Sequence, residues 1–152
     1  MEFVKQAWDK LIKDHSLPAD QSNKFWKELS GQYTKSNRYY HDLSHVENLL
    51  RLADSYHEKI EDHLVFRFSI FYHDLIYSAT RKDNELKSAQ LARQRMANFG
   101  VSHERASLAY QYILDTQHNS VPFSKDSQFL VDMDLQILGE SPERYKEYTI
   151  QV

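Results

Sequence analysis

The chain has 152 residues, no cysteine and a formal net charge of −3. This length predicts one domain with a single core, and the lack of cysteine excludes disulfides and thiolate metal sites, so the default expectation is a cytoplasmic protein. The 19 Lys and Arg are scattered among 22 Asp and Glu, which argues against a nucleic-acid duplex as partner. The N-terminal segment carries charges every few residues and has no continuous apolar stretch, so it predicts neither a signal peptide nor a membrane span.

Apolar residues recur at helical spacing along almost the whole chain, and glycine and proline occur only three times each. The first three predicted helices contain residues 4–12, 25–29 and 46–53. Four more are predicted at about 62–78, 83–98, 102–118 and 126–138, with N-caps at Asp83 or Asn84 for the second of these and at Ser102 for the third. Another begins near Ser141. The class is therefore all-α, with seven or eight helices.

The three glycines, Gly31, Gly100 and Gly139, each follow a helical segment and are expected at helix C-terminal caps. The last segment, SPERYKEYTIQV, begins an amphipathic helix and then stops. We therefore expect residues 1–152 to form one domain that lacks a closing C-terminal segment.

Three predicted helices direct metal-binding side chains toward the core. His73 and Asp74 fall on the apolar stripe of their helix, His45 begins a second stripe and Asp134 lies within a third. A buried carboxylate costs several kcal/mol unless it is paired or bound to a metal, and one divalent cation would satisfy all three helices. The predicted ligands are His45, His73, Asp74 and Asp134.

The nature of these ligands limits the choice of metal. Mixed nitrogen and oxygen ligands favour Mn, Fe, Co, Ni or Zn over Ca, with Mg also compatible. Neighbouring residues on a helix diverge by about 100°, so His73 and Asp74 can share one ion only if it lies between their two directions. The dipeptide His-Asp occurs twice, at 41–42 and 73–74, which is close to chance. It is the recurrence on three helices that indicates a metal site.

Three blocks of the sequence together resemble a known family. RYYHDLSHVENLL, FYHDLIYSATRKDNELKSAQLA and FLVDMDLQILG lie between about Arg38 and Tyr148. Their order is similar to the H…HD…D arrangement of the HD superfamily of metal-dependent phosphohydrolases, in the branch of predicted HD phosphohydrolases. The resemblance implies a single HD-domain-like helical bundle around a metal site.

The same resemblance implies a role for each ligand. His45 corresponds to the first histidine, His73 and Asp74 to the signature pair, and Asp134 to the last aspartate. Two alternatives stay open, namely His41 in place of His45 and Asp132 in place of Asp134.

Such a site predicts a metal-dependent phosphohydrolase that attacks a small phosphate ester, a nucleotide among the candidates, through metal-activated water. We expect Asp74 to orient the water as well as to bind the metal. His41 or His118 would contact phosphate or protonate the leaving oxygen. If His118 also binds metal, a second ion follows. Arg81 and Lys82 are candidate phosphate-binding residues, although a short basic pair is also typical of a solvated loop.

Glu85 is a candidate hydrogen-bond partner for a metal-binding histidine, or simply a first-turn glutamate favoured by the helix dipole. Two other functions remain as alternatives. HDLSH has the H-x-x-x-H spacing of zinc metalloproteases, with Asp42 at the position of their glutamate, but this leaves His73 and Asp134 unexplained. A non-catalytic HD-like module would bind a metal or a nucleotide without turnover.

Overall fold

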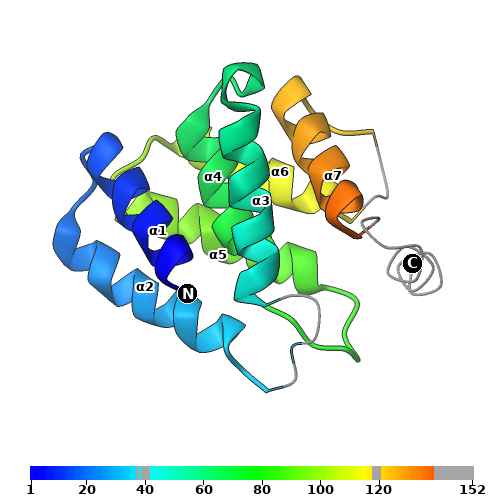
Figure 1. Ribbon diagram of the computed structural model, residues 1–152, viewed down its shortest axis with the longest axis horizontal. Coiled ribbons are helices and arrows are strands. Elements are labelled where there is room, and N and C mark those ends of the chain that lie inside the picture. The colour runs from blue at the N-terminus through cyan, green and yellow to red at the C-terminus, as the bar shows by residue number, and fades with distance from the viewer. Residues whose placement is uncertain (37, 39–41, 118–120, 139–152) are drawn as a thin grey trace.

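The computed structural model describes residues 1–36, 38, 42–117 and 121–138. Over these residues the chain forms α-helices, one 3-10 turn and no strand, which confirms the predicted all-α class (Figure 1). No helix in these ranges is both long and apolar enough to cross a membrane. The helices are α1 (Glu2–Asp14), α2 (Ala19–Tyr33), α3 (Leu43–Ser55), α4 (His63–Tyr72), α5 (Asn84–Asn98), α6 (His103–Asp115) and α7 (Lys125–Leu138), and the 3-10 turn η1 is His57–Lys59.

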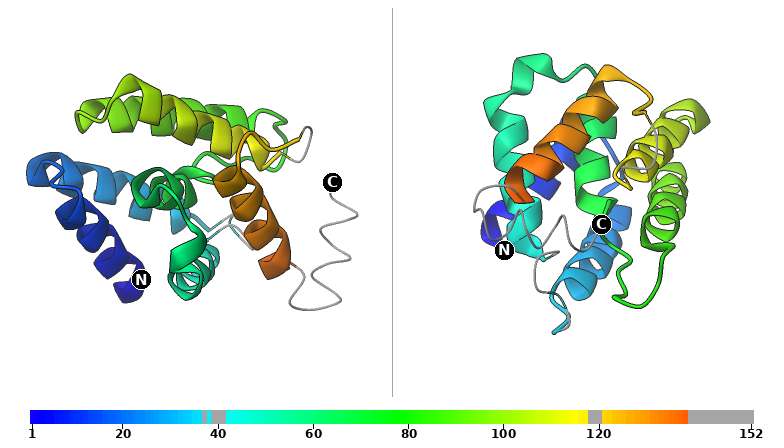
Figure 2. Two further views of the ribbon diagram at one scale, coloured as in Figure 1. Left: turned by 90° about the horizontal axis from the view of Figure 1, so that it is seen from above. Right: turned by 90° about the vertical axis from the view of Figure 1, so that its right-hand side faces the viewer.

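The short helix α4 forms the centre of the bundle. Eight of its residues are buried, as expected of a helix that is apolar on all sides. Helices α3, α5, α6 and α7 all pack against it. Helices α5 and α6 lie side by side as one layer over α4, and α1 packs on α2 and α3 (Figure 2). Helix α4 is therefore covered by other helices on most of its sides.

Trp8 of α1 joins the N-terminal helices to this centre. Its indole ring is fully buried and lies 5.1 Å from the ring of Phe71 and 6.0 Å from that of Phe68, both on α4. The indole N–H donates to the hydroxyl of Ser22 on α2 at 3.0 Å. An aromatic core of this kind fixes α4 firmly, and with it the residues at its C-terminal end.

The fourth predicted helix is shorter than expected, because α4 ends at Tyr72 rather than near residue 78. The amide of His73 still donates to the carbonyl of Ser69, but several backbone groups beyond His73 make hydrogen bonds to distant side chains instead of helical ones. The guanidinium of Arg38 donates to the carbonyls of Asp74 and Leu75, and the amide of Ile76 donates to Ser88 Oγ at 3.0 Å. The spacing of apolar residues within one helix cannot reveal hydrogen bonds to residues as far away in the chain as Arg38 and Ser88, so the end of α4 was not predictable from it.

Other predicted boundaries agree more closely with the structure. Ser102 caps α6 by accepting the amide hydrogen of Arg105, but α6 ends at Asp115, before residue 118. Gly100 has a φ of 82° at the end of α5, a conformation that favours glycine. The prediction for Gly31 is wrong, because this residue lies inside α2. Gly139, Ser141 and the last predicted helix lie outside the described residues.

Two buried carboxylates hold the start of α7. Asp126 accepts hydrogen bonds from the backbone amides of Glu61 and Asp62, both at 3.0 Å. Asp115, at the end of α6, accepts from Ser127 Oγ and from the amide of Phe123. Because Asp126 and residue 134 are two helical turns apart, they lie on the same face of α7. The anchored first turn therefore directs residue 134 toward α3 and α4.

Candidate metal centre

Four side chains from three helical elements meet beside the C-terminal end of α4. His45 lies in the first turn of α3, His73 caps the C-terminus of α4, Asp74 follows it, and Asp134 lies on α7. His45, His73 and Asp134 are more than nine-tenths buried. Asp74 is the most accessible of the four, with 16% of its side chain exposed. The predicted ligands are thus brought together by the fold.

The distances between their ligand atoms are short and similar. His45 Nε2 lies 3.2 Å from His73 Nε2 and 3.0 Å from Asp134 Oδ1. His73 Nε2 lies 3.0 Å from Asp74 Oδ2. The two longer separations are 3.7 Å between His45 Nε2 and Asp74 Oδ2, and 3.8 Å between His73 Nε2 and Asp134 Oδ1.

These separations suit a shared cation. Ligand atoms about 2.1 Å from one ion lie about 3.0 Å apart at right angles and about 3.4 Å apart in a tetrahedron. The ligand atoms of His45, His73 and Asp74 all lie within 4.8 Å of one another, and Asp134 joins the cluster through the two imidazoles. The buried cluster of His45, His73 and Asp74 can therefore hold a metal ion. His73 and Asp74 are adjacent in the chain, yet His73 Nε2 and Asp74 Oδ2 lie only 3.0 Å apart, so both atoms can reach one ion between the two side chains.

The orientation of His73 is fixed by the backbone. Its Nδ1 lies 2.7 Å from the carbonyl oxygen of Ile70, which can only accept, so Nδ1 carries the proton. In its neutral form the imidazole presents the lone pair of Nε2 to the cluster, as a metal ligand must. Burial lowers the pKa of His73, but the carboxylates of Asp74 and Asp134 outweigh this effect and raise that pKa to about 9, so at neutral pH a metal ion has to displace a proton from the ring.

The structure distinguishes Asp134 from Asp132. Asp132 is exposed and accepts a hydrogen bond from Gln128 Nε2 at 2.8 Å on the outer face of α7. Asp134 faces inward, where burial would raise its pKa, but its hydrogen bond with His45 keeps the pKa below the usual value. A carboxylate that stays ionised in a buried site is a suitable metal ligand.

The carboxylate of Asp42, which stands at the position of the protease glutamate in the H-x-x-x-H interpretation, acts as a helix cap. Helix α3 begins at Leu43, and Asp42 accepts hydrogen bonds from the amides of Ser44 and His45 as its N-cap. His41 and His118 themselves lie outside the described residues, so their proposed catalytic roles stay predictions.

Arg38 is a contributor to the site that the sequence did not reveal. Its side chain is buried, and its two terminal nitrogens donate to the carbonyls of Asp74 and Leu75. Its guanidinium lies 5.0 Å from the ring of Tyr33 and 5.5 Å from that of Tyr77. Arg38 thereby holds the turn that carries the metal-binding pair. The only signal in the sequence is its position at the start of the block RYYHDLSHVENLL.

The remaining predicted residues lie around the following loop. Arg81 and Lys82 are exposed, and Arg81 pairs with Asp83 at 3.1 Å. Glu85 is half-buried on α5 and accepts a hydrogen bond from Gln117 Nε2 at 3.5 Å. The second ring nitrogen of His73 is bonded to Ile70, so Glu85 is not the partner of that histidine. Asn84 instead braces the loop, with its amide bonded to both backbone groups of Ser78.

Comparisons of the chain with protein families, curated proteins and solved structures found no match. What the fold and the site establish is thus an all-α chain, over the residues described, with a buried histidine and aspartate cluster that can hold a metal. Any narrower function has to be argued from the residues themselves.

Proposed function

We propose that the protein is a metal-dependent phosphohydrolase with an HD-type metal centre. The observation that carries this proposal is the convergence of two imidazole nitrogens and two carboxylates, with neighbouring atoms 3.0 to 3.8 Å apart, from α3, α4 and α7. The order of these residues in the chain, a histidine, a His-Asp pair and a distant aspartate, is the pattern on which the resemblance to HD phosphohydrolases was based. Geometry and sequence order thus support the same ligand set.

His45, His73, Asp74 and Asp134 would hold one divalent cation, of which Mn, Fe, Co, Ni, Zn and Mg are the candidates. Such an ion lowers the pKa of a coordinated water and polarises a phosphoryl oxygen. The protein's own contribution is to keep two carboxylates ionised and two imidazoles correctly oriented in a buried site.

Among the four ligands, Asp74 is best placed to act on the attacking water. Its side chain is the most exposed of the set, so a water molecule can reach it from solvent. Its backbone is held by Arg38, which limits movement of the carboxylate. Asp74 would therefore orient the water and accept its proton, a role that contributes about 100-fold or more to the rate.

The loop that follows the metal-binding pair would receive the phosphate. Arg81 and Lys82 are exposed there. Arg81 forms an ion pair with Asp83, and both of these side chains are accessible to solvent. A substrate phosphate can compete for such a pair, because exposed ion pairs contribute little. A small phosphorylated molecule is the proposed substrate, with a nucleotide as one candidate.

The first test is metal analysis of the purified protein, followed by a hydrolysis screen. Para-nitrophenyl phosphate, nucleoside mono- and triphosphates and bis-para-nitrophenyl phosphate would be offered with added Mn, Co, Ni, Zn or Mg. We expect bound divalent metal and hydrolysis that chelation abolishes. The Asp74→Asn variant should lose about 100-fold or more in rate. Asp132→Asn is the matched control, because it removes an exposed carboxylate near the site and should keep the rate.

Three other outcomes would each be informative. Protein that binds no metal would overturn the proposal. Bound metal without hydrolysis of any phosphate ester would favour the non-catalytic module. Hydrolysis that is unchanged in Asp74→Asn would show that the activity arises elsewhere.

A further inference from the structure

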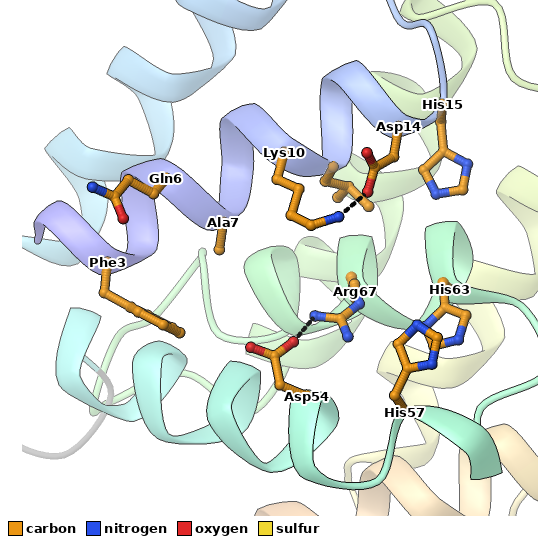
Figure 3. A pocket seen from close by; sticks show the side chains of 11 residues that line it. Phe3, Gln6, Ala7, Lys10, Asp14, His15, Asp54, His57, His63 and Arg67 are labelled. Carbon is orange, nitrogen blue, oxygen red and sulfur yellow. Dashed lines mark hydrogen bonds and ion pairs between the residues drawn. The ribbon is translucent and has the colours of Figure 1, made fainter.

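A second candidate site lies away from the metal centre, in a cavity of about 380 Å³ (Figure 3). Its walls come from α1, the end of α3, η1 and the start of α4. This volume is within the range of about 300 to 1,000 Å³ that is typical of small-molecule sites. The polar side chains that matter here are Lys10, His15, Asp54, His57, His63 and Arg67.

The two ion pairs of this cavity differ in how deeply their cations are buried. The side chain of Arg67 is 15% exposed, whereas that of its ion-pair partner Asp54 is 57% exposed. Lys10 and Asp14 also pair with each other at the rim, where both are well exposed. The Arg67 guanidinium is therefore the most buried charge of the lining, and the two carboxylates lie where solvent screens their charges.

Several N–H groups of the Arg67 guanidinium are not used in hydrogen bonds to the described residues. Its guanidinium donates from Nη1 to Asp54 Oδ1 at 2.8 Å, and it makes no other hydrogen bond within the described ranges. In Figure 3 it points into the cavity, between Asp54 and the two stacked histidines. A guanidinium in this position can bind an oxyanion through its remaining N–H groups.

The histidines add further donors to the same wall. The rings of His57 and His63 are stacked with centroids 4.0 Å apart, and His15 lies across the cavity from them (Figure 3). His63 Nδ1 is buried and has no hydrogen-bond partner among the residues described. Burial also lowers the pKa of His15 and His63, so each is neutral near pH 7 and retains one N–H. An unpaired polar atom in a protein interior is unusual and calls for a partner.

A metal ion is not that partner. His45, His73 and Asp74 form a group of three side chains with metal-binding geometry. Among the described residues, the cavity histidines belong to no such group. An anion fits better, because Arg67, His15 and His63 all offer N–H groups.

We propose that this cavity binds the oxyanion group of a small molecule, a phosphate or a carboxylate, with Arg67 as the main contact and His15 and His63 as further donors. The site does not rest on the proposed hydrolase activity. It lies apart from the metal centre, because Asp54 is about 14 Å from His45 along α3 and Arg67 is about 9 Å from His73 along α4.

The test is a titration of the metal-bearing protein followed by NMR of the histidine side chains. Sodium phosphate and sodium succinate would be added separately, at pH 7 and constant ionic strength. We expect saturable shifts of the imidazole signals of His15 and His63 with one of the two anions, and the anion that saturates them identifies the source of the oxyanion group. The Arg67→Gln variant should weaken this binding about tenfold or more, because it removes a charge-assisted hydrogen-bond donor.

Arg93→Gln is the matched control, since Arg93 lies on α5 over the ring of Tyr110, outside the cavity, and its loss should leave the affinity unchanged. If Arg67→Gln does not fold, His15→Asn tests the same wall and should also weaken binding. Shifts that stay linear with both anions would overturn the proposal. So would saturable shifts confined to His45 and His73, or an affinity that neither variant changes.

Discussion

The Nε2 atoms of His45 and His73 lie 3.2 Å apart, although 28 residues separate the two histidines in the chain. Two ring nitrogens that face each other in a buried site need a proton or a cation between them, because two lone pairs repel. The carboxylates of Asp74 and Asp134 adjoin the same two nitrogens. With this concentration of negative charge and lone pairs, the cluster can hold a metal ion.

Substitution of single carboxylates on α7 should show whether Asp134 or Asp132 binds the metal. Asp134→Asn is expected to lower metal affinity by more than about tenfold, since even partners outside the ligand set cost that much when they are lost. Asp132→Asn, two residues earlier on the exposed face, should bind metal like the wild type. Metal content after dialysis, measured by plasma mass spectrometry, checks both. Equal loss in the two variants would contradict the assignment.

Metal removal should lower thermal stability. An ion present at 100 times its dissociation constant stabilises a native protein by about 2.7 kcal/mol. For a chain of this size that corresponds to about 5 to 10 °C in Tm. Differential scanning fluorimetry with added Mn, Co or Zn, and with a chelator, measures the shift. Asp134→Asn should show little response, whereas an identical response in that variant would argue that the ion binds elsewhere.

Arg38 should matter for both stability and metal binding. Arg38→Met keeps most of the side-chain volume but leaves the carbonyls of Asp74 and Leu75 without their donor. We expect a loss of about 2 to 3 kcal/mol in the free energy of unfolding and about tenfold in metal affinity. Urea denaturation and metal titration measure the two effects.

Arg81→Met provides the comparison for stability, because Arg81 is exposed and its pair with Asp83 should contribute less than about 1 kcal/mol. If Arg38→Met and Arg81→Met are equally stable, Arg38 does not hold the turn.

Asp62 should contribute pH-dependent stability. Burial opposes its ionisation, but the hydrogen bonds from Arg105 outweigh this effect and hold the pKa of Asp62 below its usual value. A depressed carboxyl pKa stabilises the fold above the unfolded pKa of about 3.9, and this stability is lost as the pH falls through the lower folded value. Both side chains are partly exposed, so the effect at pH 7 should not exceed about 1 kcal/mol.

The Asp62→Asn variant isolates the pH-dependent contribution of this ion pair to stability, since asparagine still caps α4 but cannot form an ion pair with Arg105. Urea denaturation from pH 2.5 to 7 should show the wild type more stable near neutrality and equal to the variant at the acidic end. In an Arg105→Gln background the substitution should have no further effect of this kind. A difference between wild type and Asp62→Asn that is constant with pH would contradict the ion pair.

The helical periodicity was sufficient to predict the all-α class and the inward direction of His45, His73 and Asp134. This is so because each inference needs only neighbours within two turns of one helix. The N-cap at Ser102 and the glycine conformation at Gly100 were predictable for the same reason.

Only the tertiary structure decided what depends on residues far apart in the chain. The end of α4 at Tyr72 follows from hydrogen bonds that Arg38 and Ser88 make to the next turn. The position of Asp134 follows from Asp126, which holds the first turn of α7 against the amides of Glu61 and Asp62. The sequence by itself thus determined which side chains face inward. Their meeting within 3 to 4 Å, and the cavity at the far end of the same helices, were decided by packing between helices, which no local pattern encodes.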